Sequence, residues 1–366
     1  MQTAEPIGTG VPYFKGSITR VIGAAVVSGV ALWLAARNVH ADGLRSALAR
    51  ATFLWLLPYP VVCIALNVIR GEIWRLLLRQ RVSSAQAFWA YTVGFVVNNA
   101  LPFRAGEAAR VLVLSRRSQL PIVEVAAAAG LERLLDLAVL SLMLLALGPS
   151  VIRIPGLASG GVFVAVLVAG ALGVIAMLAR LREHLPAAIA AATGWLSPSA
   201  RQEAVERTRD LTRGLTVLLR PAVGIPAAAG ALVVWVLTVL LQWLVLRSFQ
   251  PDAGVTDAAF MVAAVSLASA LPAAPGFVGV YHWAGQQSLV SAFPQLYDAS
   301  TALAAATVAH AVSYVTSTVL GVIGLWYFGI PPSAVGRIRD GDRNELPPEN
   351  TLGREADSPA GIPTYE

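Results

Sequence analysis

The sequence predicts an all-α polytopic membrane protein with about six spanning helices and two re-entrant helical elements in inverted repeats. Three observations predict this fold class. Hydrophobic residues make up 56% of the 366-residue chain and charged residues only 13%, a composition typical of integral membrane proteins. Several apolar runs are long enough to cross about 30 Å of hydrocarbon. Two further apolar stretches are interrupted by proline and glycine.

Each uninterrupted apolar run predicts one spanning helix, because a bilayer needs about 20 apolar residues in helical form. These runs cover residues 18–36, 52–69, 121–148, 157–181, 223–249 and 299–328. The second helix is expected to end in a charged group that contains Arg70, Glu72, Arg75, Arg79 and Arg81.

Polar segments divide the chain into parts. Residues 1–17 form a polar lead, and residues 18–330 form the transmembrane domain. The tail, 331–366, has few apolar residues and is expected to be disordered. Within the domain, residues 182–222 form a basic block with apolar residues at helical spacing, which predicts a cytoplasmic linker with an interfacial helix.

Basic residues predict the orientation, because cytoplasmic loops of membrane proteins gather Lys and Arg. The group at 70–81, the linker and the tail hold most of the basic residues. Placing these segments in the cytoplasm leaves both termini inside. The interrupted stretches, 86–118 and 255–292, then enter and leave on one side each, the first from the cytoplasm and the second from outside.

The two interrupted stretches also resemble each other. The first contains N-A-L-P-F-R-A-G at 99–106 and the second S-A-L-P-A-A-P-G at 269–276. Repeat one would cover 52–148 and repeat two 223–328, in opposite orientations. Secondary transporters use such inverted repeats and bind their substrates at the repeat interface near the midplane.

The first stretch is expected to break as a helix at Pro102 and Gly106, beside the two amides Asn98 and Asn99. Irregular backbone at membrane depth is tolerated only inside protein or along a water-filled cavity. The two amides either satisfy backbone groups freed by the break or contact a ligand.

Charged residues follow this break at Arg104, Glu107 and Arg110. Glu107 suits the start of a helix and pairs with Arg110 at i, i+3. Arg104 has fewer local partners, and an arginine at a helix N-terminus can hold a phosphate or carboxylate. Arg104 therefore contacts either an anionic ligand or a protein carboxylate.

Three more charged residues, Glu132, Arg133 and Asp136, lie inside the third predicted helix. Such residues rarely face lipid. One interpretation is a salt-bridge lock between helices, for example with Arg104 or Arg110. The other is a functional role as proton relay or as counter-charge for a cationic headgroup.

The second stretch contains flexible positions followed by histidines. The expected breaks are Pro272, Pro275, Gly276 and Gly279, and the candidate binding residues are His282 and His310. Each histidine is either a hydrogen-bonded packing residue or part of the site. No His has metal-ligand spacing with Cys or carboxylates, so neither a metal nor a cofactor is expected. A basic soluble face for nucleic acid is also absent from the sequence.

Three ordered motifs carry a resemblance to a known family. N-N-A-L-P-F-R-A-G-E-A-A-R at 98–110, E-R-L-L-D at 132–136 and L-P-A-A-P-G-F-V-G-V at 271–280 resemble the transmembrane region of lysylphosphatidylglycerol synthases. The resemblance covers roughly 15–330. It implies a multi-pass protein of the bacterial inner membrane that translocates lipids with modified headgroups. Phe277 and His282 stand where the family commonly has glycine and glutamate.

The resulting hypothesis is a lipid flippase that is not an enzyme and moves an aminoacyl-phospholipid or a polyprenyl-phosphate-linked lipid. Its partners would be membrane lipids and a glycosyltransferase or lipid-modifying enzyme. The alternative is a non-transporting subunit that scaffolds such an enzyme. A third hypothesis is an integral enzyme with Glu132 and Asp136 as acid and base. The lipid and the oligomeric state stay open.

Overall fold

The fold is helical throughout the part of the chain that the structure describes. The computed structural model describes residues 17–101, 104–147, 157–270 and 273–331. Within those ranges it contains thirteen α-helices and no strand, which confirms the predicted all-α class. The predicted lead and tail, apart from Ser17 and Pro331, lie outside the described residues, as do Pro102 and Pro272.

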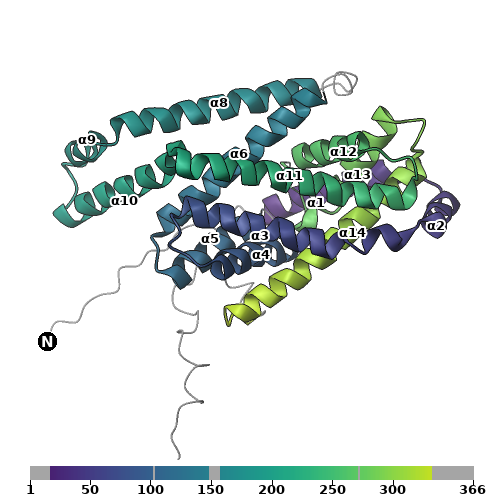
Figure 1. The fold of residues 1–366 in the computed structure, drawn as a ribbon, viewed down its shortest axis with the longest axis horizontal. Coiled ribbons are helices and arrows are strands. Elements are labelled where there is room, and N and C mark those ends of the chain that lie inside the picture. The colour runs from purple at the N-terminus through teal and green to yellow at the C-terminus, as the bar shows by residue number, and fades with distance from the viewer. Residues whose placement is uncertain (1–16, 102–103, 148–156, 271–272, 332–366) are drawn as a thin grey trace, which may run out of the picture.

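The helices form a bundle elongated along one axis (Figure 1). The first six are α1 (Ser17–Ala36), α2 (Ala41–Arg50), α3 (Tyr59–Leu77), α4 (Ser84–Ala100), α5 (Ala105–Ser118) and α6 (Ile122–Ala146). Those that follow are α8 (Leu157–Leu181), α9 (Leu185–Ala192), α10 (Pro198–Thr216), α11 (Pro221–Phe249), α12 (Val255–Ala268), α13 (Val280–Ala292) and α14 (Ala299–Tyr327). Short 3₁₀ turns cover Phe53–Leu56, Val217–Leu219 and Pro275–Phe277.

Within the described ranges, three helices are long and apolar enough to cross a membrane. They are Phe53–Leu77, Pro221–Phe249 and Ala299–Tyr327, and a fourth span exists if α1 and α2, bent by 80°, count as one. The helix expected over 121–148 is present as α6, but its interior carries Glu132, Arg133 and Asp136. The structure thus supports a membrane-embedded bundle, while the number of six spans stays a prediction.

The second predicted helix continues beyond its apolar run. The run covers 52–69, and α3 ends within the charged group, at Leu77. Arg70 is 13% exposed and pairs with Glu132 and Asp136 inside the bundle, rather than lying on the cytoplasmic flank. Because the Arg70 charge is paired within the bundle, it is compatible with an intact helix at this position.

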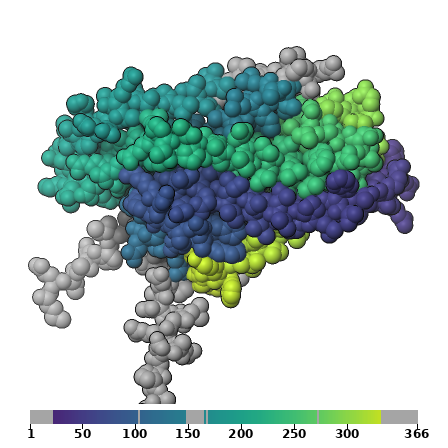
Figure 2. All heavy atoms as spheres, in the orientation of Figure 1, coloured from purple at the N-terminus to yellow at the C-terminus, as the bar shows by residue number. Residues whose placement is uncertain are grey.

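The same order of elements occurs twice. A long helix, a broken helix pair and another long helix follow one another twice. The first unit consists of α3, α4–α5 and α6, and the second unit consists of α11, α12–α13 and α14. Helix α3 packs along α11, and α4 packs along α14. The pair α4–α5 lies toward the end that carries α9 and α10, and α12–α13 lies toward the opposite end with α2 (Figure 1). The space-filling view shows these linker helices and α2 at the two ends (Figure 2).

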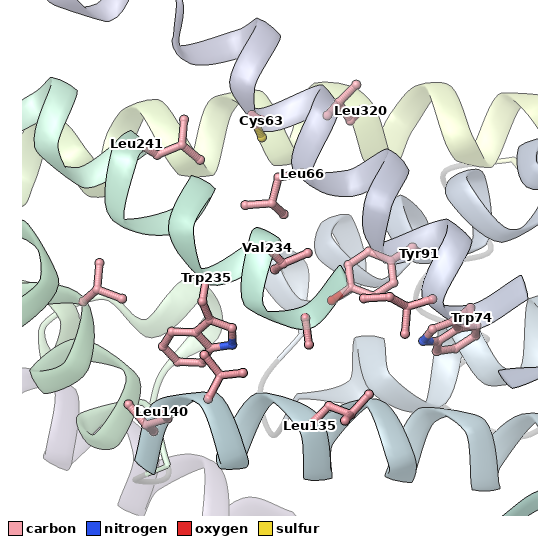
Figure 3. Packing of buried hydrophobic residues seen from close by; sticks show 14 of the residues in the cluster. Cys63, Leu66, Trp74, Tyr91, Leu135, Leu140, Val234, Trp235, Leu241 and Leu320 are labelled. Carbon is pink, nitrogen blue, oxygen red and sulfur yellow. The ribbon is translucent and has the colours of Figure 1, made fainter. Parts of the chain in front are cut away.

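Small residues allow α14 to approach α4 closely. A Cβ added at Gly321 would lie 2.7 Å from the Val96 Cβ, and one at Gly324 would lie 2.7 Å from the Thr92 hydroxyl oxygen. Glycine at helix interfaces permits such close backbone approach in membranes. Apolar side chains of α3, α6, α11 and α14 complete the core (Figure 3). Helix α14, of the second unit, is thereby fixed against the broken pair of the first.

Candidate functional site

A closed network of charges occupies the middle of the bundle. It contains three arginines and three carboxylates from α3, α5 and α6, namely Arg70, Arg110, Arg133, Glu107, Glu132 and Asp136. Every member forms an ion pair with another member. Because the arginines and carboxylates are equal in number, the set carries no formal net charge. Five of these six residues were predicted from the sequence, and Arg70 was not.

Glu132 lies at the centre of the network. It is 1% exposed, and its carboxylate accepts a hydrogen bond from Arg70 at 2.7 Å. The Arg110 guanidinium lies 3.2 Å from its other oxygen. Arg70 also reaches Asp136 at 3.1 Å. Arg110, which is 2% exposed, additionally pairs with Glu107. Glu132 and Arg110 are therefore held inside protein rather than offered to a ligand.

Arg133 closes the network on its more accessible side. Its guanidinium lies 2.8 Å from Glu107 and 3.3 Å from Asp136. Its side chain is 41% exposed, in contrast to that of Arg110. The network thus has a buried part around Glu132 and an open part at Arg133 and Glu107.

Aromatic side chains surround the buried part. The Trp74 indole N–H donates to Glu132 at 2.7 Å, and the Trp235 indole N–H donates to Asp136 at 3.0 Å. Figure 3 shows these two indoles on α3 and α11, on either side of the core above α6. The Arg110 guanidinium lies 4.6 Å from the centroid of the Tyr91 ring, within cation–π range. The two indole hydrogen bonds satisfy carboxylate lone pairs that burial would otherwise leave without partners.

The first helix break lies beside this network. Leu101, which precedes Pro102 in the sequence, is extended (φ −119°, ψ 145°), as the residue before a proline prefers to be. Helix α5 then begins after Arg104, whose backbone is left-handed (φ 53°). The Gly106 N–H, one of the free donors at the start of α5, donates to the Asn98 side-chain oxygen at 2.8 Å. Asn98 therefore has the structural role that the sequence left open.

Asn99 connects the same break to α14. Its amide donates to Thr318 at 2.8 Å and to Ser317 at 3.2 Å. The Tyr314 hydroxyl donates back to the Asn99 main-chain oxygen at 3.2 Å. The break in the first unit is thus held by the last helix of the second unit.

The second break has a different local structure. After α12, Gly276, Phe277 and Gly279 all have positive φ (67°, 60° and 88°). A Cβ at Gly279 would collide with the main chain of α1 at Ser28, so glycine is required by both conformation and space. Ser28 also accepts a hydrogen bond from the Ala274 N–H at 2.8 Å. Helix α1 therefore supports this break from outside the repeated units.

The two predicted histidines lie next to each other at the second break. Their ring centroids are 4.9 Å apart. His310 Nε2 donates to the Gly276 carbonyl at 2.7 Å, and the Gly279 N–H donates to His282 Nδ1 at 3.3 Å. Tyr281 stacks on His310 with centroids 4.8 Å apart. Each histidine thus forms a hydrogen bond with a main-chain group of the second break. Of the two, His310 lines the cavity described below and His282 does not.

Arg104 joins the two breaks. Its guanidinium donates to the Ser269 main-chain oxygen at 2.5 Å and to the Ser269 hydroxyl at 3.2 Å. The same group lies 5.4 Å from the centroid of the Phe277 ring. Among the residues that the structure describes, no carboxylate lies within 4.0 Å of Arg104, so none of the described acids forms the salt bridge considered from the sequence.

A cavity of about 390 Å³ lies between the two breaks. Helices α3, α4, α5, α6, α11, α12 and α14 all contribute to its lining. The predicted site residues that line it are Asn98, Asn99, Arg104, Glu107, Arg133, Gly276 and His310. Arg110, Glu132, Asp136 and His282 support the lining from behind. The cavity thus combines a paired charge network, one arginine without an acidic partner, and an aromatic wall.

Several lining residues were not singled out from the sequence. They are Tyr59, Asn67, Arg70, Tyr91, Gln242 and Tyr281. One signal was present for α3, where Asn67, Arg70 and Trp74 follow a helical spacing on one face of the helix. The tyrosines carry no such signal, because aromatic residues are common in membrane helices.

The sequence model of a known family, described as the lysylphosphatidylglycerol synthase TM region, matches residues 21–321. The chain belongs to this family. Both helix breaks, the charge network and the cavity lie within the matched segment. Membership confirms the resemblance carried by the three sequence motifs and relates the chain to membrane proteins of lipid modification. No curated protein and no solved structure matches the chain.

Proposed function

We propose that the protein is a flippase that moves a polar-headgroup lipid across the bacterial inner membrane. The headgroup occupies the central cavity while the hydrocarbon chains remain in the bilayer. The lipid is of the aminoacyl-phospholipid or polyprenyl-phosphate-linked type. The protein acts as a transporter rather than as an enzyme, and both of its termini lie in the cytoplasm.

The observation that carries this proposal is the charge of Arg104 inside the cavity. The other arginines of the lining, Arg70 and Arg133, are neutralised by carboxylates of the network. Among the described residues, Arg104 has a carbonyl, a hydroxyl and an aromatic ring as its partners. A guanidinium binds phosphate through paired, charge-assisted hydrogen bonds. A lipid phosphate would therefore complete the coordination of Arg104.

The arrangement of the two breaks supports movement between the two membrane faces. The pairs α4–α5 and α12–α13 lie toward opposite ends of the molecule, and their breaks meet at the cavity (Figure 1). Inverted repeats with a midplane site between broken helices are the arrangement used by many secondary transporters. In such proteins, rocking one repeat against the other exposes the site to each side in turn.

The contact between Arg104 and Ser269 gives this movement a structural basis. It joins the loop before α5 to the end of α12 by two hydrogen bonds. A phosphate that takes these bonds from Arg104 would release the two breaks from each other. Binding of the headgroup and separation of the repeats would then be one coupled event.

The test is a flipping assay in proteoliposomes with phosphatidylglycerol, lysylphosphatidylglycerol and polyprenyl phosphate, each labelled on its hydrocarbon chain. The wild type should translocate at least one of these lipids. Arg104→Gln should slow translocation about tenfold or more, since a charge-assisted hydrogen bond contributes about 1.5–3 kcal/mol. Arg207→Gln is the matched control, because Arg207 pairs with Glu203 on the exposed surface of α10.

Two results would overturn the proposal. One is equal translocation by Arg104→Gln and the wild type. The other is absence of translocation of every lipid by folded wild-type protein together with a stably co-purifying enzyme, which would favour the scaffolding alternative.

A further inference from the structure

A second hollow lies at the linker end of the bundle, away from the central cavity. Its volume is about 770 Å³, and it lies between α9 and α10 on one side and the ends of α3 and α11 on the other. Figure 1 shows α9 and α10 at this end of the molecule. The charged residues of its lining are five arginines and one glutamate, namely Arg79, Arg182, Arg209, Arg213, Arg220 and Glu183.

Most of this positive charge is not balanced locally. Glu183 lies 3.5 Å from Arg182, and Asp210 lies 3.8 Å from Arg213. In the described part of the chain, Arg79, Arg209 and Arg220 have no carboxylate within 4.0 Å. The hollow therefore gathers like charges that repel one another.

Arg79 shows this repulsion most directly. Burial lowers its pKa, and the neighbouring Arg220, Arg81 and Arg213 lower it further. Its backbone is left-handed (φ 55°), a conformation that costs a non-glycine residue free energy. Its guanidinium nevertheless stays in place by donating to the Arg213 main-chain oxygen at 3.0 Å.

The arginines of α10 are also fixed in position. Gly214 packs against α6 so closely that an added Cβ would lie 2.7 Å from the Ala127 Cβ. Thr212, which precedes it, is 7% exposed. Helix α10 is thus anchored to the membrane bundle, and Arg209 and Arg213 project from an anchored helix. The positive-inside tendency explains basic residues on this side, but it does not require them to converge on one hollow.

We propose that this hollow is a second binding site, which takes the phosphate group of a lipid headgroup or of a soluble phosphate compound. Guanidinium groups match phosphate oxygens in geometry and charge. The volume lies within the range of about 300–1,000 Å³ that is usual for ligand pockets. The lining begins within a few residues of the ends of α3 (Leu77) and α11 (Pro221), so both an anionic lipid headgroup and a soluble phosphate compound could reach it.

The test compares two arginine pairs in the full-length protein. Arg209 and Arg220 line the hollow and have exposed side chains, so the R209Q/R220Q variant should fold. The control R45Q/R207Q removes the same charge from exposed positions outside the hollow. Binding is measured with pyrophosphate by calorimetry, and with phosphatidylglycerol or phosphatidylcholine nanodiscs by native mass spectrometry of retained lipid.

Wild type and R45Q/R207Q should bind equally well, and R209Q/R220Q should bind about tenfold more weakly, which corresponds to about 1.4 kcal/mol. Binding of pyrophosphate would identify a soluble phosphate ligand. Selective retention of phosphatidylglycerol without pyrophosphate binding would identify a lipid headgroup. Equal weakening in both variants would show diffuse electrostatic attraction and would overturn the proposal. The proposal would also be overturned if the wild type bound neither pyrophosphate nor phosphatidylglycerol.

Discussion

Replacing Glu132 with glutamine should destabilise the fold by about 3 kcal/mol. The substitution keeps the shape of the side chain and leaves an oxygen to accept from Trp74, which lies at 2.7 Å. It removes the negative charge that faces Arg70 at 2.7 Å and Arg110 at 3.2 Å. The buried network would then change from neutral to a net charge of one.

The magnitude follows from the remaining contacts. Removing one partner of a buried ion pair costs about 3–5 kcal/mol, because the other charge is left without compensation. Arg70 would still reach Asp136 at 3.1 Å, and Arg110 would still pair with Glu107. The lower end of the range is therefore expected.

The measurement is the free energy of unfolding by steric trapping in bicelles. Glu203→Gln is the control, because Glu203 is 61% exposed and such surface pairs contribute about 0–1 kcal/mol. The double variant Arg110→Gln/Glu132→Gln should lose less than the sum of its single variants, since contacting charges couple. A Glu132→Gln loss no larger than that of Glu203→Gln, or strictly additive losses, would refute a closed network.

Two other substitutions test packing and hydrogen bonding elsewhere in the bundle. Gly106→Ala should lose about 1–3 kcal/mol of unfolding free energy, because its Cβ would collide with the Gly94 main-chain oxygen and lie 2.7 Å from the Asn98 side chain. Gly130→Ala meets open space and should not be destabilised, and equal effects of the two substitutions would contradict the close approach of α5 to α4. Tyr297→Phe should lower the free energy of unfolding by about 1.5–3 kcal/mol, because the buried Tyr297 hydroxyl donates to the Asp257 carboxylate at 3.1 Å. The control is Tyr327→Phe at an exposed position, and an equal loss in both variants would show that the Tyr297–Asp257 hydrogen bond contributes nothing.

The sequence was sufficient for the helical membrane class and for the break before α5. Proline and glycine act locally, so Leu101 and Gly106 have the backbone roles that their neighbours dictate. The sequence also indicated that the charges at 132–136 avoid lipid, because a charge that faces lipid is costly wherever its partner lies in the chain.

The partners themselves could not be predicted, because they depend on packing between distant segments. In the sequence, Arg70 resembles a residue of a cytoplasmic flank, whereas in the fold it pairs with two carboxylates of α6. Arg104 was expected to face either a ligand or a protein acid, and its contact with Ser269 joins positions 165 residues apart. Pairings at such separations leave no local pattern in the chain.

A structure determined in phosphatidylglycerol nanodiscs would test headgroup binding most directly. We expect a lipid phosphate within about 3 Å of the Arg104 guanidinium, between the break before α5 and the break after α12. Its hydrocarbon chains should extend into the surrounding bilayer. Lipids confined to the outer surface of a protein that still translocates them, with only water in the cavity, would contradict a headgroup pathway through this site.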